Sequence, residues 1–196
     1  MALISFSEAT DMILMSVIVG FIFMKLLERA KGNYMKSHNV NHDPLKQSYG
    51  FDWDLFKKAV IIVAPAIIFH EFGHKFVAMA FGATATFYAA YRWLFFGAFL
   101  ALMNSPFIVF VPAYVSIPMN GLTSLQFSMV AAAGPLVNAL LWGLAAIAIK
   151  YNWFNKKYYP ILIMTKKINM FLFIFNMLPI PGFDGFKVYS GLFSLL

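Results

Sequence analysis

Residues 59–81 read AVIIVAPAIIFHEFGHKFVAMAF, an apolar run of helical length that carries His70, Glu71 and His74 as an H-E-x-x-H pattern. On a helix, residues i and i+4 lie on the same face, so both imidazoles can reach one metal ion. Glu71 then projects beside them, toward a metal-bound water. The structural alternative is a hydrogen-bonded histidine pair with Glu71 pairing Lys75 at i+4. Because an acid inside a membrane helix is costly and usually has a functional partner, the pattern favours a metal site.

The composition indicates a chain that lies in a lipid bilayer. Of the 196 residues 61% are hydrophobic and only 12% are charged, which leaves too little polar surface for a soluble globule. The absence of cysteine excludes a disulfide scaffold and a thiolate metal site. The net charge of +7 comes from short basic clusters between apolar runs. This pattern is typical of juxtamembrane loops, and we expect no nucleic-acid partner.

The apolar runs predict a mainly α protein, a polytopic membrane helix bundle of about four spans. After the second span we expect a membrane-embedded hairpin or β-region, because two apolar pieces of about 11 residues are too short to cross as helices. The acidic start of the chain argues against a cleaved signal peptide. The predicted parts are an N-terminal span with a polar loop (1–56) and a membrane core (57–196). The core comprises a metal-binding helix (57–81), the embedded hairpin region (82–126), a third span (127–149) and a broken fourth span (158–187).

The third metal ligand follows from elimination. A catalytic zinc site normally has three protein ligands and one open position. After His74 the sequence holds no further histidine or glutamate, and Asp184 is the only acid. Asp184 follows Pro179-Ile-Pro181-Gly182, which cannot remain regular helix and can aim a carboxylate into the bundle. If the third span runs antiparallel between the second and fourth, His70 and Asp184 meet at intermediate depth.

A second histidine pair occurs upstream. His38, His42 and Asp43 also have i, i+4 metal-ligand spacing. They lie in a polar stretch without a carboxylate in the position that Glu71 occupies, so we interpret them as solvated surface residues.

Three ordered motifs resemble the site-2 protease family of intramembrane zinc metalloproteases. They are His-Glu-Phe-Gly-His at 70–74, Ala-Ala-Ala-Gly-Pro-Leu-Val-Asn at 131–138, and Asn176-x-x-Pro179-x-Pro181-x-x-Asp184-Gly185. The likeness covers residues 57 to 187.

The resemblance implies one catalytic Zn²⁺ held by His70, His74 and Asp184, with Glu71 as the catalytic acid and base. Asn176 would help to hold the tetrahedral intermediate or the substrate strand.

The implied substrates are transmembrane helices of other proteins, cut within the bilayer, and region 82–118 would receive the substrate as an added strand. The alternatives are a catalytically silent membrane adaptor and a metal-transport protein. The oligomeric state stays open.

Membrane orientation is the point on which two indications differ. The resemblance implies a multi-pass protein whose active site lies nearer the cytoplasmic face, and we adopt this expectation. It puts the segment before the H-E-x-x-H helix outside. The stretch from Lys25 to Lys58 carries seven of the 15 basic residues, and counting them would put the same segment in the cytoplasm.

Overall fold

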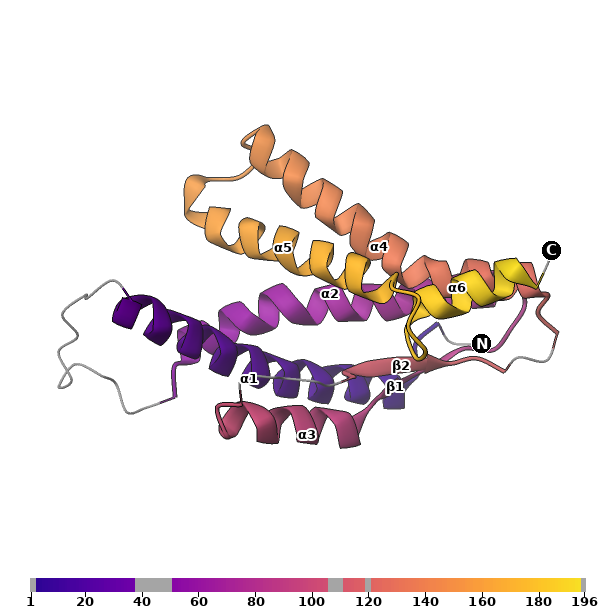
Figure 1. Ribbon diagram of the computed structural model, residues 1–196, viewed down its shortest axis with the longest axis horizontal. Coiled ribbons are helices and arrows are strands. Elements are labelled where there is room, and N and C mark those ends of the chain that lie inside the picture. The colour runs from indigo at the N-terminus through magenta and orange to yellow at the C-terminus, as the bar shows by residue number, and fades with distance from the viewer. Residues whose placement is uncertain (1–2, 38–50, 106–110, 119–120, 195–196) are drawn as a thin grey trace.

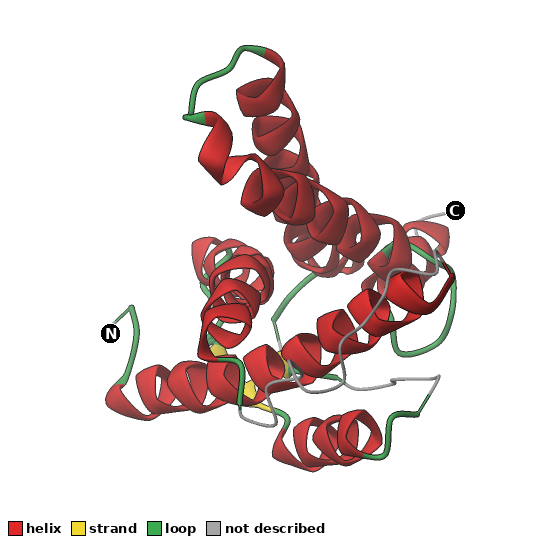
Figure 2. Cartoon of the chain, turned by 90° about the vertical axis from the view of Figure 1, so that its left-hand side faces the viewer, coloured by secondary structure: helices red, strands yellow, loops and turns green. Residues whose placement is uncertain are grey.

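The computed structural model describes residues 3–37, 51–105, 111–118 and 121–194. The chain is mainly helical (Figures 1 and 2). The elements in chain order are α1 (Phe6–Ser37), α2 (Trp53–Ala80), β1 (Thr86–Ala89), α3 (Tyr91–Leu102), β2 (Ala113–Ser116), α4 (Ser124–Lys150), η2 (Lys156–Tyr158), α5 (Tyr159–Asn176) and α6 (Asp184–Phe193).

Three helical segments are long and apolar enough to cross a membrane, judged by length and composition. They are Phe6–Asn33, Ser124–Lys150 and Lys156–Asn176. The expectation of about four spans is thus supported for three of them. The fourth, α2, has 28 residues but is not among the three, and it carries the ionisable groups of the H-E-x-x-H pattern.

Region 82–126 differs in detail from a simple hairpin. The apolar piece from Trp93 to Met103 lies in helix α3, and among the described residues the short strands β1 and β2 flank it. The second apolar piece, 107–117, begins outside the described residues, and its described part contains β2. The strands β1 and β2 pair antiparallel, with Phe87 opposite Val115 and Ala89 opposite Ala113. A two-stranded sheet is marginal alone, and here residues of both strands join the buried core with α1 and α2.

The direction of the helices positions the site. Helices α2 and α5 run the same way along the molecule, and α4 returns antiparallel to both (Figure 1). Close approach of α2 and α4 depends on Gly73, since a Cβ there would lie 2.7 Å from the carbonyl oxygen of Ala133. After α5 the chain leaves helical geometry across Pro179, Pro181 and Gly182, and Gly182 takes a φ of +98°. Helix α6 then starts at Asp184.

Candidate metal centre

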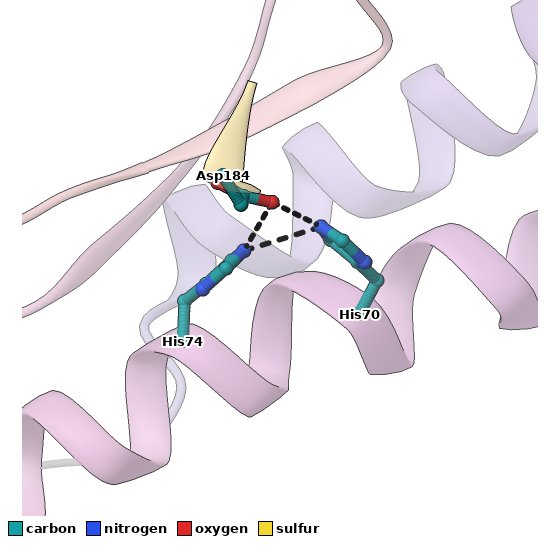
Figure 3. Close-up of side chains that lie close together, drawn as sticks. All are labelled: His70, His74 and Asp184. Atoms are coloured by element: carbon teal, nitrogen blue, oxygen red, sulfur yellow. Dashed lines mark hydrogen bonds and ion pairs between the residues drawn. The ribbon is translucent and has the colours of Figure 1, made fainter. Parts of the chain in front are cut away.

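His70, His74 and Asp184 converge although 114 residues separate the first from the last (Figure 3). The Nε2 atoms of the two histidines lie 3.1 Å apart. Oδ2 of Asp184 lies 3.1 Å from Nε2 of His70 and 3.2 Å from Nε2 of His74. These two nitrogen atoms and one oxygen atom therefore form a nearly equilateral triangle. All three residues are buried, and they lie close enough together to bind one metal ion.

The second ring nitrogen of His74 identifies its tautomer. Nδ1 lies 2.8 Å from the carbonyl oxygen of Val130, which can only accept a hydrogen bond. Nδ1 therefore carries the proton, and Nε2 of the neutral ring presents a lone pair to the triangle.

A chain of buried amides fixes the tautomer of His70 in the same way. Asn138 donates through Nδ2 to the carbonyl oxygen of Ala66 at 3.0 Å and to Oδ1 of Asn169 at 2.9 Å. Asn169 donates in turn to the carbonyl oxygen of Thr165. Since these backbone carbonyls accept only, Oδ1 of Asn138 faces His70, where it lies 2.6 Å from Nδ1. Nδ1 of His70 is therefore the donor.

The donor set fits a zinc ion. When both rings are neutral, two lone-pair nitrogens and a carboxylate oxygen face one another, which is the arrangement that a zinc ion binds. Zinc bound tetrahedrally at about 2.0–2.1 Å requires ligand atoms about 3.3–3.4 Å apart, close to the spacing in this triangle. Metal-binding histidines also regularly donate a hydrogen bond from the ring nitrogen that does not bind the metal, as both Nδ1 atoms do here. The sequence predicted the three ligands, and the structure places them in a suitable arrangement.

Gly134 provides the room beside this triangle. A Cβ at this position would lie 2.3 Å from Nε2 of His74 and 2.8 Å from Nε2 of His70. A side chain at position 134 would therefore displace the imidazoles, so the glycine is a requirement of the site's geometry.

Asp184 is the first residue of α6, where a carboxylate is favoured by the helix dipole. Its second oxygen, Oδ1, lies 3.4 Å from Nζ of Lys187, whose side chain is 46% exposed. Lys187 therefore lies at the margin of the triangle, and sequence reasoning did not single it out.

Glu71 and Asn176 are placed differently with respect to the triangle. Glu71 is buried on α2, and its carboxylate interacts electrostatically with His70, His74, Asp184 and Lys187. Asn176 is the last residue of α5 and is half-buried. The second histidine pair, His38 and His42 with Asp43, lies outside the described residues.

Sequence reasoning missed the residues that orient the ligands. Asn138 lay within a quoted motif, but its hydrogen bond to His70 was not foreseen. Sequence reasoning did not single out Asn169, and a backbone carbonyl such as that of Val130 gives no sequence signal. A polar residue in the middle of a predicted span is the signal that could have found Asn138 and Asn169.

Comparison with known proteins gives one informative relative. The chain is 39% identical over 135 residues to a protein of Methanocaldococcus jannaschii named "Putative zinc metalloprotease MJ0611". The match covers 68% of this chain and 70% of that protein. The chain belongs to this zinc metalloprotease family. No family model and no solved structure matches it.

Membership of the zinc metalloprotease family agrees with the chemistry of the site. The name of the relative specifies zinc, and the triangle of two imidazole nitrogens and one carboxylate oxygen suits that metal. The carboxylate of Glu71 is also buried, and it interacts electrostatically with the three residues of the triangle.

Proposed function

We propose that the protein is an intramembrane zinc metalloprotease of the site-2 type, which cuts transmembrane helices of other proteins within the bilayer. The observation that carries the proposal is the triangle of His70, His74 and Asp184 in a chain whose helices are long and apolar enough to cross a membrane. Family membership supports zinc and proteolysis. The motifs quoted above support the site-2 type.

The proposed ligands are His70, His74 and Asp184. When bound, zinc would polarise the scissile carbonyl and lower the pKa of a water molecule toward 7. Glu71 takes a proton from the attacking water as its oxygen bonds to the acyl carbon. Glu71 then gives that proton to the nitrogen as the C–N bond breaks, so the products are a carboxyl group and an amine. The burial of Glu71 keeps this proton transfer away from bulk water.

We assign Asn176 to the substrate. The side chain lies where α5 ends, and the backbone beyond it is non-helical up to Asp184. An amide there can donate to the carbonyl oxygen on which negative charge develops, or to an extended substrate strand.

The sheet supplies a place for an unwound substrate. A helical substrate hides its carbonyls in i to i−4 hydrogen bonds and must unwind locally before it can be cut. The register pairs β2 with β1 along one edge only, so the backbone groups of Ala113 and Val115 point away from β1. We propose that the substrate adds as a strand along this edge.

We propose the orientation in which the zinc site lies nearer the cytoplasmic face. His70 lies closer to the C-terminal than to the N-terminal end of α2. The opposite end of the molecule holds the C-terminal end of α1 and the loop between α4 and α5 (Figure 1). A single cysteine in place of Asn155, in a chain that has no other cysteine, reports the side of that loop. A membrane-impermeant thiol reagent should label it from outside the cell, and labelling only after membrane opening would contradict the proposal.

The alternatives predict different polar residues. A metal transporter needs ligands along a path through the membrane, whereas the described residues bring together one metal-ligand cluster. A silent adaptor has no need of Glu71 and Asp184 beside the histidines. The alternatives are therefore not favoured.

The deciding experiment compares the wild type with Glu71→Gln in zinc content and in cleavage of a helical membrane substrate. We expect Glu71→Gln to keep stoichiometric zinc and to lose cleavage at least a thousandfold, because the amide cannot accept the proton. Retained cleavage in this variant would contradict the mechanism. Zinc transport into proteoliposomes by both forms would favour the transporter.

A further inference from the structure

The first turns of α1 carry two carboxylates that lie against the edge of β1. Oε1 of Glu8 accepts the backbone N–H of Phe87 at 2.8 Å, and Oδ2 of Asp11 accepts that of Ala89 at 3.0 Å. The N–H groups of alternate residues leave the same edge of a strand. Glu8 and Asp11 therefore satisfy this edge as a neighbouring strand would, and we call these two residues the α1 clamp.

The other edge of β1 pairs with β2. The backbone N–H of Ala90 donates to the carbonyl oxygen of Pro112 at 3.1 Å, which continues the ladder beyond the two strands. β1 is thus held on both edges, by α1 on one side and by β2 on the other.

Glu8 also binds the metal-bearing helix. Its Oε1 accepts from Nζ of Lys75, the residue that follows His74, and the two side chains are 4% and 2% exposed. The backbone N–H of Ser5 donates to Oε2 at 2.8 Å. A buried ion pair is tolerated when its remaining hydrogen-bonding capacity is satisfied, as it is here. One carboxylate therefore joins α1, α2 and β1.

Asp11 has a second partner just beyond β1. The phenol of Tyr91 donates to Oδ1 at 2.5 Å. This hydrogen bond raises the pKa of Tyr91 to about 12, so the phenol keeps its proton in the physiological range. The Asp11 carboxylate thus holds both the end of β1 and the start of α3.

We propose that Glu8 and Asp11 are positioning residues that fix the β1–β2 sheet at a set distance from the metal-bearing helix α2. The apolar core around Phe87 holds these elements together, but apolar contacts are not directional. The hydrogen bonds to Phe87 and Ala89 specify the register of β1 along α1, and the ion pair specifies the position of α2. The consequence for cleavage, that a substrate strand on the sheet is aligned with the metal centre, rests on the proposed function.

The test measures the distance between sheet and helix in the full chain. Because the chain has no cysteine, spin labels can be placed on cysteines replacing Ile61 on α2 and Ser116 on β2, both of which are exposed. Pulsed electron paramagnetic resonance then gives the distribution of the distance between the labels. We expect one narrow distribution for the protein with an intact α1 clamp.

Two variants each remove one of the two carboxylates of the α1 clamp. Asp11→Ala removes the acceptor of Ala89 and leaves the buried ion pair in place. Glu8→Met with Lys75→Met removes the pair without leaving an unpaired charge. We expect each to broaden the distribution at least twofold. The control is Glu28→Gln, whose partner Lys25 lies on the same helix in a half-exposed pair, and it should leave the distribution unchanged.

Equal widths of the distance distribution in the wild type and in Asp11→Ala would overturn the proposal. This comparison is decisive even if the Glu8→Met, Lys75→Met double variant fails to fold. Zinc content should stay unchanged in Asp11→Ala while kcat/KM for a helical substrate falls about tenfold. A parallel loss of zinc would show that the clamp supports the metal ligands instead, and would also overturn the proposal. If the wild type binds zinc but cuts nothing, the proposed function fails, and the distance measurement still decides the role of the clamp.

Discussion

The imidazole of His70 on α2 donates to the side-chain amide of Asn138 on α4, with Nδ1 of the ring 2.6 Å from Oδ1 of the amide. Asn138 is fully buried and is itself held by the carbonyl of Ala66 and the amide of Asn169. A ligand from one helix is thus oriented by a hydrogen-bond chain that crosses two others. Because Nδ1 of His70 carries the proton, Nε2 of the neutral ring has a lone pair that can bind a metal ion.

Replacing Asn138 by leucine should weaken zinc binding about 10- to 100-fold, because the His70 ring loses the acceptor that fixes its tautomer and orientation. Competition with a chelator of known affinity measures the change. Asn155→Ala is the matched control, since this asparagine accepts only a local backbone N–H in an exposed loop. Equal zinc affinity in Asn138→Leu and the wild type would contradict the orienting role.

Gly134→Ala should abolish stoichiometric zinc binding. The added Cβ would lie 2.3 Å from Nε2 of His74, and the clash can be relieved only by moving the ring or the α4 backbone. Gly143→Ala on the same helix is the control, because nothing lies within 4 Å of a Cβ there. We expect Gly143→Ala to bind zinc normally. Zinc analysis of both purified variants checks the prediction, and full occupancy in Gly134→Ala would contradict it.

The cluster of His70, His74 and Asp184 could be predicted from the sequence because ionisable groups are scarce in an apolar chain. The spacing of His70 and His74 requires only helical geometry, and Asp184 was the only acid left after His74. The helical break before Asp184 follows from Pro179 and Pro181, which remove backbone donors. These inferences depend on local chemistry, which a single sequence displays.

The remaining contacts depend on which helix faces which, and the sequence does not display this. Glu8 and Lys75 lie 67 residues apart, and Lys75 could equally have paired with Glu71 at i+4. Region 82–126 was ambiguous because a run of about 11 apolar residues suits a strand or a helix. The described residues of this region contain helix α3 and two short strands, of which β1 is held by distant carboxylates.

Asp184→Asn and Lys187→Met should differ strongly in their effect on zinc. The amide removes a charged ligand, so we expect zinc affinity to fall at least a hundredfold in Asp184→Asn. Lys187 contacts the second carboxylate oxygen of Asp184 and is half-exposed, so its loss should change zinc affinity less than about fivefold. Isothermal titration with zinc measures both. Similar losses in the two variants would show that Lys187 is essential for holding Asp184.

Removal of zinc should lower the thermal stability of the wild type while leaving its helix content almost unchanged. Without a cation, His70, His74 and Asp184 lose the common ion that would hold them together, but the helices remain packed through their apolar faces. At a zinc concentration 100 times the Kd, the stabilisation is about 2.7 kcal/mol. Melting temperatures with and without chelator, measured with circular dichroism, check this. Glu71→Gln should show the same zinc-dependent shift and Asp184→Asn a much smaller one, and equal shifts in all three proteins would contradict the assignment of Asp184 as a ligand.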